Sequence, residues 1–179
     1  MRHVSWKAAL AFALAMAILP AVAAAQSSCT GCTITGTAGN DIIYGTAGAD
    51  TICALGGDDT VYGLGGDDHL CGYTGNDQLY GGSEADLCEG HEGVDYLVGD
   101  TENDQLIGWR DGDTLDGWTG NDDLFGSRNN DFLLGYSGND NLYGENDNDT
   151  LDGEAGTDYL DGGAGTDSCV NGETYVSCP

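Results

Sequence analysis

Basic residues are almost missing from this chain. Its 179 residues include four lysines and arginines against 31 aspartates and glutamates, which gives a formal net charge of -27 at pH 7. A surface this acidic repels nucleic acid and anionic membranes, so both are excluded as natural partners. The same charge opposes a compact state by self-repulsion, and we therefore expect a cation to belong to the folded form.

Long apolar stretches are also scarce, and the one present stands at the N-terminus. Arg2 and Lys7 precede an apolar run that ends at Pro20, and small residues follow up to Ala25. This is the layout of a secretory signal peptide, so we predict cleavage after residues 1–25 and a secreted, extracellular protein. An uncleaved anchor is the alternative, but the run is short and rich in alanine for a membrane span, and no later stretch could insert in a bilayer. Cleavage would move the formal net charge from -27 to -29, because it removes two basic residues.

Signatures of catalytic sites are missing too. The sequence has no G-x-S-x-G nucleophile elbow. It also has no 12-residue EF-hand loop, which is a calcium-binding motif of another kind. His69 and His91 stand isolated in the sequence and are interpreted as surface residues. Zinc is disfavoured for this reason, and also because the cysteines are not arranged as a set of metal ligands. We therefore predict that the protein is not an enzyme.

What the sequence has instead is one repeat of nine residues. It begins at Gly36 with the blocks GTAGNDIIY, GTAGADTIC and ALGGDDTVY, and it continues without a gap through fifteen blocks to Val170. Position one is glycine everywhere except at Ala54, and position eight is always apolar or cysteine. Position six is aspartate in every block: Asp41, Asp50, Asp59, Asp68, Asp77, Asp86, Asp95, Asp104, Asp113, Asp122, Asp131, Asp140, Asp149, Asp158 and Asp167.

The repeat predicts an all-β fold. The last three residues of a block form a short strand with one inward side chain, and the first six, rich in Gly, Asn and Asp, form a turn. Two blocks close one coil of about 18 residues, and stacked coils form a parallel β-roll, or β-solenoid, with two short parallel sheets. Odd-numbered blocks supply one sheet and even-numbered blocks the other. Residues 26–35 are a lead-in segment, 36–170 the β-roll and 171–179 a C-terminal cap.

The predicted core is too thin to hold this fold alone. About one residue in nine points inward, and burial at about 25 cal/mol per Å² does not offset backbone ordering of about 1–2 kcal/mol per residue. Position-six aspartates of successive coils stack about 4.8 Å apart and repel each other unless a cation lies between them. Calcium suits such carboxylates and free backbone carbonyls, whereas magnesium prefers strict octahedra and keeps its waters.

The blocks resemble the RTX, or hemolysin-type, calcium-binding nonapeptide repeats, G-G-x-G-x-D-x-U-x. The resemblance covers residues 36–170. It implies a parallel β-roll with several Ca²⁺ ions, each held in a turn by the position-six aspartate and by backbone carbonyls. It also implies disorder without calcium and folding on export.

Some blocks depart from the family pattern at position four, where glycine is replaced by Glu84, Glu102, Asp111, Asn129 and Asp147. Glutamate adopts a left-handed backbone less readily than asparagine or aspartate, so calcium sites there are expected to be weaker or built differently. The family commonly carries a C-terminal export signal, whereas the signal predicted here is N-terminal.

All seven cysteines follow the predicted cleavage site, and export favours disulfides. Cys53 and Cys71 both occupy position nine, two blocks apart, so they are predicted to form a bridge on the outer face of adjacent coils. Cys88, at an inward position, is then the odd thiol. The predicted pairs are Cys53 with Cys71, Cys169 with Cys178, and Cys29 with Cys32.

Two classes of function remain. The first is a secreted calcium-binding structural or surface module that folds on binding calcium. The second is a calcium-dependent adhesion or ligand-binding protein that presents a solenoid face to a glycan, a cell surface or ice. Tyr44, Tyr62 and Tyr80 recur in every second block and predict an outward ladder. Such a ladder fits a binding platform, but we favour cross-strand packing that protects the sheet.

Overall fold

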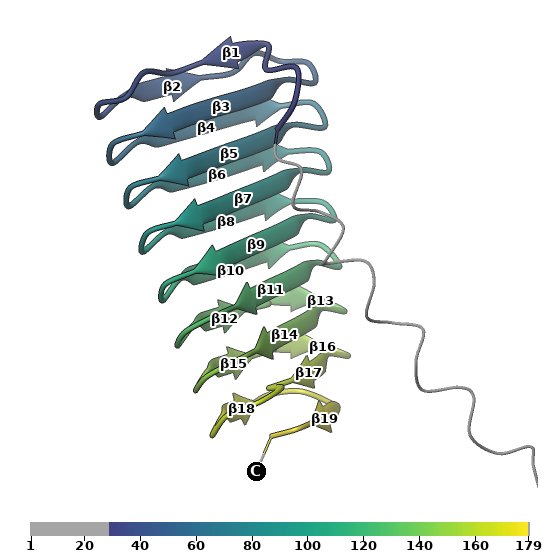
Figure 1. Ribbon diagram of the computed structural model, residues 1–179. Coiled ribbons are helices and arrows are strands. Elements are labelled where there is room, and N and C mark those ends of the chain that lie inside the picture. The colour runs from purple at the N-terminus through teal and green to yellow at the C-terminus, as the bar shows by residue number, and fades with distance from the viewer. Residues whose placement is uncertain (1–28, 179) are drawn as a thin grey trace, which may run out of the picture.

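The computed structural model describes residues 29–178, which form strands and no helix (Figure 1). The predicted all-β class is therefore confirmed. The predicted signal peptide, residues 1–25, lies outside the described residues. Within residues 29–178 there is no helix of the length and hydropathy needed to cross a membrane.

The strands form two parallel sheets that face each other along the whole stack (Figure 1). One sheet has nine strands and the other has ten. The nine-stranded sheet consists of β1 (Ile34–Thr35), β3 (Thr51–Gly56), β5 (His69–Thr74), β7 (Leu87–Glu92), β9 (Gln105–Arg110), β11 (Asp123–Ser127), β14 (Asn141–Glu145), β17 (Tyr159–Asp161) and β19 (Thr174–Val176). The ten-stranded sheet consists of β2 (Ile42–Tyr44), β4 (Thr60–Gly65), β6 (Gln78–Ser83), β8 (Tyr96–Thr101), β10 (Thr114–Thr119), β12 (Phe132–Leu134), β13 (Ser137–Gly138), β15 (Thr150–Asp152), β16 (Ala155–Gly156) and β18 (Ser168–Val170).

The register between neighbouring strands is an offset of two blocks throughout the repeats. Ile52 pairs with Leu70 in the nine-stranded sheet, and Leu115 pairs with Leu133 in the ten-stranded sheet. Each coil of the β-solenoid therefore contains two blocks, as predicted. Strands of even blocks lie in the nine-stranded sheet and strands of odd blocks in the ten-stranded sheet, so the predicted division is also confirmed.

The core is a single file of side chains between the sheets, supplied mainly by position eight. Leu70, Leu97 and Leu124 are fully buried there, as is the free thiol of Cys88. The layer is as thin as the repeat predicts, because each block contributes essentially one inward side chain.

The strands are longer than the sequence predicts. The eight consecutive strands β3 to β10 cover six residues each, from position seven of one block to position three of the next, so that only positions four to six turn the chain there. Position two, expected in the turn, lies within the strand: Trp118 pairs with Asp100 although φ is 71° at the tryptophan. The prediction missed this because it assigned positive φ to the glycine-rich turn, whereas bulky residues also adopt it here within a hydrogen-bonded strand.

Candidate metal centres

The position-six aspartates line the two edges of the solenoid where the chain crosses between sheets. Eight lie in turns that follow the nine-stranded sheet: Asp41, Asp59, Asp77, Asp95, Asp113, Asp131, Asp149 and Asp167. Seven lie in turns that follow the ten-stranded sheet: Asp50, Asp68, Asp86, Asp104, Asp122, Asp140 and Asp158. The structure thus assembles each predicted column along one edge.

One carboxylate oxygen of these aspartates is used by the backbone. Oδ1 of Asp122 accepts the N–H of Asp104 at 2.8 Å, and Oδ1 of Asp140 accepts the N–H of Asp122 at 2.9 Å. The same bond recurs from Asp59 to Asp167, always between aspartates two blocks apart. At the C-terminal end Glu173 replaces the next aspartate, because its Oε2 accepts the N–H of Asp158 at 2.6 Å. These hydrogen bonds account for the position of Oδ1 without a metal ion.

The second carboxylate oxygen of these aspartates, Oδ2, mostly lacks a hydrogen-bond partner. Among the described residues, Oδ2 is buried without a hydrogen-bond partner in thirteen of the fifteen aspartates, all those from Asp59 to Asp167. A buried carboxylate oxygen without a partner is strongly unfavourable, and a native fold is expected to supply one. These thirteen oxygens are the feature of the molecule that most needs a ligand.

The first two aspartates of the columns are different. Oδ2 of Asp41 accepts hydrogen bonds from the backbone and hydroxyl of Thr37 at 2.7 and 2.8 Å. Asp50 is held in the same way by Thr46 at 2.8 and 2.9 Å. Hydrogen bonds from the Thr46 side chain and backbone lower the pKa of Asp50. Threonine at position two thus satisfies the carboxylate that other blocks leave open.

The glycine at position one explains where the free oxygen lies. A Cβ on Gly72 would stand 2.2 Å from Oδ2 of Asp77, and a Cβ on Gly108 would stand 2.3 Å from Oδ2 of Asp113. Backbone carbonyls of the next coil approach the same space, since a Cβ on Gly72 would also lie 2.9 Å from the oxygen of Gly90. Position one therefore has to be small because the carboxylate occupies the space a side chain would fill.

Burial and repulsion disturb the titration of these carboxylates. Burial, together with repulsion from neighbouring aspartates, raises the pKa of Asp104 to about 8, against the hydrogen bond from the backbone of Asp86. For the same reasons the pKa of Asp113 rises to about 9 and that of Asp122 to about 7. A column of buried carboxylates at neutral pH needs either protons or a cation to balance its charge.

This donor set fits calcium. It offers carboxylate oxygens and backbone carbonyls without nitrogen or sulfur, as a hard cation requires. The residues that would hold calcium are the aspartates with a free Oδ2, together with nearby main-chain carbonyls. Bound calcium would supply the positive charge that the column lacks.

The position-four departures are accommodated in the stack. Glu84 and Asp147 adopt φ values of 73° and 79°, in the left-handed region. Their side chains accept backbone N–H groups of the preceding coil: Oε2 of Glu84 from Gly66 at 2.9 Å and Oδ2 of Asp147 from Asn129 at 3.1 Å. These bonds compensate for backbone strain, and weaker calcium binding at these turns stays a prediction.

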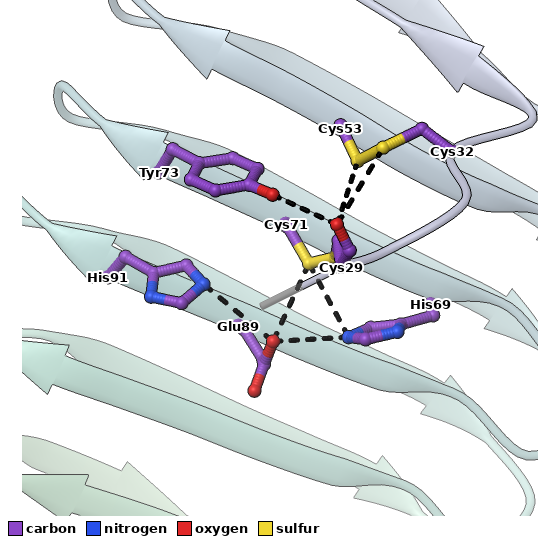
Figure 2. Close-up of polar contacts among 8 residues, drawn as sticks. All are labelled: Cys29, Cys32, Cys53, His69, Cys71, Tyr73, Glu89 and His91. Atoms are coloured by element: carbon purple, nitrogen blue, oxygen red, sulfur yellow. Dashed lines mark hydrogen bonds and ion pairs between the residues drawn. A yellow bond between two sulfur atoms is a disulfide. The ribbon is translucent and has the colours of Figure 1, made fainter. Parts of the chain in front are cut away.

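The predicted disulfides are partly wrong. Cys53 does not pair with Cys71, and Cys29 does not pair with Cys32; the bridges are Cys29–Cys71 and Cys32–Cys53. Residues 29–33 of the lead-in segment lie against the outer face of the nine-stranded sheet, so Cys53 and Cys71 are fully buried and not exposed as predicted (Figure 2). Spacing within the repeat cannot reveal this, because the partners precede the repeat.

The other cysteine predictions are confirmed. Cys169 is bonded to Cys178, and Cys88 is the free cysteine of the described chain. Burial raises the pKa of the Cys88 thiol well above its ordinary value, so it stays protonated as a small core residue.

Sequence reasoning missed a second polar cluster, on the outer face of the nine-stranded sheet. Oε2 of Glu89 lies 3.1 Å from Nε2 of His69 and 3.7 Å from Nε2 of His91 (Figure 2). Burial opposes ionisation of Glu89, but both histidines outweigh it and lower its pKa to about 2. Writing the chain in rows of two blocks would have shown that Glu89 stacks on Cys71, but not that it contacts both histidines, because these occupy other columns. The interpretation of isolated surface histidines is therefore wrong.

Comparison with protein families gives a match along the repeats. A family description built from four copies of the RTX calcium-binding nonapeptide repeat matches overlapping segments at residues 33–61, 54–88, 62–97, 89–124, 98–133, 119–151 and 134–169. Together these segments extend over most of the described residues. Comparison with curated protein sequences gives no match.

Proposed function

The chain belongs to the RTX calcium-binding nonapeptide repeat family, and from this premise we propose that it is a secreted structural or surface module that folds when calcium fills its turns. It binds calcium and catalyses no reaction. The observation that carries the proposal is the double column of buried aspartates whose Oδ2 atoms have no partner within the described chain.

Backbone strain supports coupled folding. Eighteen non-glycine residues of the described chain have positive φ, among them Leu55 at 82° and Trp109 at 80°. Such conformations cost about 1–3 kcal/mol each and persist only when their surroundings impose them. A core one side chain thick is a weak source of that constraint, whereas calcium bound between successive coils is a strong one.

Export is supported by the chemistry of the cysteines. Three disulfides join six of the seven cysteines in the described chain. Such bridges persist in oxidising compartments outside the cytosol, where calcium is also abundant. Together with the predicted signal peptide, they favour a protein that meets its calcium after export.

Circular dichroism of the chain from Gln26 tests the coupling. We expect a largely disordered spectrum in chelator and a β-rich spectrum in millimolar calcium, with magnesium as the control that leaves the chain disordered. A spectrum that is β-rich in chelator and unchanged by calcium would contradict the proposal.

Calorimetry gives the number of ions. Eight turns on one edge leave seven gaps and seven turns on the other leave six, so thirteen ions is the ceiling for sites between stacked turns. We expect fewer, because five turns depart from glycine at position four. Binding of only one or two ions per chain would be incompatible with calcium along both columns.

A second candidate function is adhesion through the ten-stranded sheet. Its outer face carries Tyr44, Tyr62 and Tyr80 in a stack with ring centroids 5.1 and 5.0 Å apart, and Tyr44 is 60% exposed. Flat exposed aromatic surface suits a sugar ring, although the same stacking protects the sheet. A glycan array with the calcium-loaded chain tests it, and binding unaffected by Tyr44→Ala would exclude this face.

A further inference from the structure

The outer face of the nine-stranded sheet brings together four side chains that ligate transition metals. Ligand atoms of Cys29, His69, Cys71 and Glu89 all lie within 4.8 Å of one another (Figure 2). Three come from neighbouring strands β5 and β7, and Cys29 comes from the lead-in segment. This cluster is separate from the aspartate turns, because it lies on a sheet face and not at an edge.

The separations among three of the four donor atoms are close to those of ligands around one ion. Sγ of Cys71 lies 3.4 Å from Nε2 of His69 and 3.5 Å from Oε2 of Glu89. The two latter atoms lie 3.1 Å apart. In a tetrahedral zinc site, bond lengths of about 2.0–2.3 Å place neighbouring ligand atoms about 3.3–3.8 Å apart. His69, Cys71 and Glu89 therefore need only small shifts to surround a zinc ion, whereas the Cys29 sulfur has to move away from that of Cys71.

Burial favours a site here over a chance surface cluster. Cys71 is fully buried, Glu89 is 3% exposed and Cys29 is 6% exposed. Nε2 of His91 is also buried, has no hydrogen-bond partner among the described residues and faces Oε2 of Glu89 at 3.7 Å. Polar groups this enclosed are already separated from water, so a metal would bind without much further loss of hydration.

The sulfur atoms, however, already form the Cys29–Cys71 disulfide. A sulfur in a disulfide has no thiolate to offer, so bridge and four-ligand site exclude each other. We propose that this cluster is a redox-controlled zinc site, closed as a disulfide when oxidised and able to bind Zn²⁺ through Cys29, His69, Cys71 and Glu89 when reduced.

The chemistry of the exchange balances with a dithiol reductant. The reductant transfers two electrons and two protons to the Cys29–Cys71 bond, which breaks into two thiols while the reductant becomes a disulfide. Zinc then forms two Zn–S bonds, and both thiol protons pass to water.

The exchange would preserve a structural link. The disulfide ties the lead-in segment to β5, and the zinc ion would join the same residues once the bridge opens. Tyr73 holds Cys29 in place without any sulfur bond, because its hydroxyl donates a hydrogen bond to the Cys29 carbonyl at 3.1 Å. The segment thus stays close enough to β5 for Cys29 to ligate after reduction.

Cobalt is a direct probe of such a site. Co²⁺ bound to thiolates has strong charge-transfer absorption bands, which Co²⁺ bound to the oxygen ligands of the turns would lack. The calcium-saturated chain would be titrated with Co²⁺ after reduction by a dithiol and anaerobic removal of the reductant, in parallel with the oxidised chain. We expect one Co²⁺ per reduced chain, with thiolate charge-transfer bands that Zn²⁺ abolishes, and no such bands in the oxidised chain.

Matched variants separate this site from the other cysteines. His69→Ala and Glu89→Gln should each weaken Co²⁺ binding at least about tenfold. The double variant C32S/C53S, which removes only the neighbouring bridge, should keep the bands, as should Cys88→Ser. The proposal is overturned by absent bands, by bands that survive His69→Ala and Glu89→Gln, by equal binding to the oxidised chain, or by loss of the β-rich spectrum on reduction.

Discussion

The two oxygens of a position-six aspartate have different tasks. Oδ1 accepts a backbone N–H from the preceding coil, which aligns successive turns, while Oδ2 has no partner among the described residues and is the proposed calcium ligand. An asparagine could perform the first task but not the second, since its amide nitrogen is a donor. The presence of aspartate in all fifteen blocks thus agrees with a need for charge as well as for hydrogen bonding.

Asp122→Asn and Asp41→Asn form a matched pair of substitutions. Asp122→Asn keeps the Oδ1 bond but removes the negative oxygen, so we expect the local calcium site to weaken at least about tenfold. Asp41→Asn should change calcium binding little, because Thr37 already satisfies that carboxylate. Calcium titration of both variants checks this, and equal losses would show that the free Oδ2 is not the ligand.

Gly108→Ala tests the space beneath the carboxylate. Its Cβ would stand 2.3 Å from Oδ2 of Asp113, so the aspartate must move and we expect a loss of about 1–3 kcal/mol in the free energy of unfolding with calcium. Gly48→Ala is the control, because nothing lies within 4 Å of its Cβ. Thermal or denaturant unfolding of both variants measures the difference. Equal stabilities would mean that position one is glycine for another reason.

The longer strands, β3 to β10, each join two blocks and not one. The nine-residue alternation predicts positions seven to nine as strand, but pairing continues to position three of the next block, as in β5. Position-two side chains therefore stand on the sheet faces and stack between coils, as Tyr73 does on His91 at 5.2 Å. Intrinsic preferences could not predict this, because such φ values are unusual for bulky residues.

The bridge between Cys169 and Cys178 is a local clamp on the last coil. It closes a short loop, so the C169S/C178S variant should lose about 2–3 kcal/mol of local stability. Hydrogen exchange should become faster in β18 and β19, while β3 and β5 keep their protection because their bridges are intact. Uniform loss of protection along the solenoid would instead indicate that the whole stack unfolds as one unit.

The calcium-free molecule should be more stable in acid than at neutral or higher pH. Burial, with repulsion between carboxylates, raises the pKa of Asp95 to about 7 and that of Asp104 to about 8 in the fold. In the unfolded chain both stay near the ordinary value of about 4. Between these values the fold binds more protons than the unfolded chain, so its stability is lost as pH rises from about 4 to about 8.

Circular dichroism in chelator tests this sign. We expect more β structure at about pH 5 than at about pH 8, with calcium removing most of the difference because the ion takes the place of the protons. The affinity for calcium should correspondingly rise with pH over the same range. More β structure at the higher pH in chelator would show that the buried columns are not what destabilises the calcium-free fold.

The sequence by itself determined the coil of two blocks, the inward file of position-eight side chains, the division of odd and even blocks between two sheets and the aspartate columns. It could do so because a repeat without gaps allows only one register. Each block packs mainly against the blocks two before and two after it, which have the same pattern. The family resemblance and calcium as the ligand followed from the same columns.

Only the tertiary structure decided where the lead-in segment lies and which outer side chains meet. Cys29 reaches Cys71 across 42 residues and Cys32 reaches Cys53 across 21, and neither separation is a whole number of coils. Glu89 meets His69, 20 residues earlier, because strands β5 and β7 are neighbours in the sheet, and it meets His91 on its own strand β7. Periodicity determines contacts within a column, but contacts between columns and with residues outside the repeat depend on side-chain directions and on the path of the chain across the sheet.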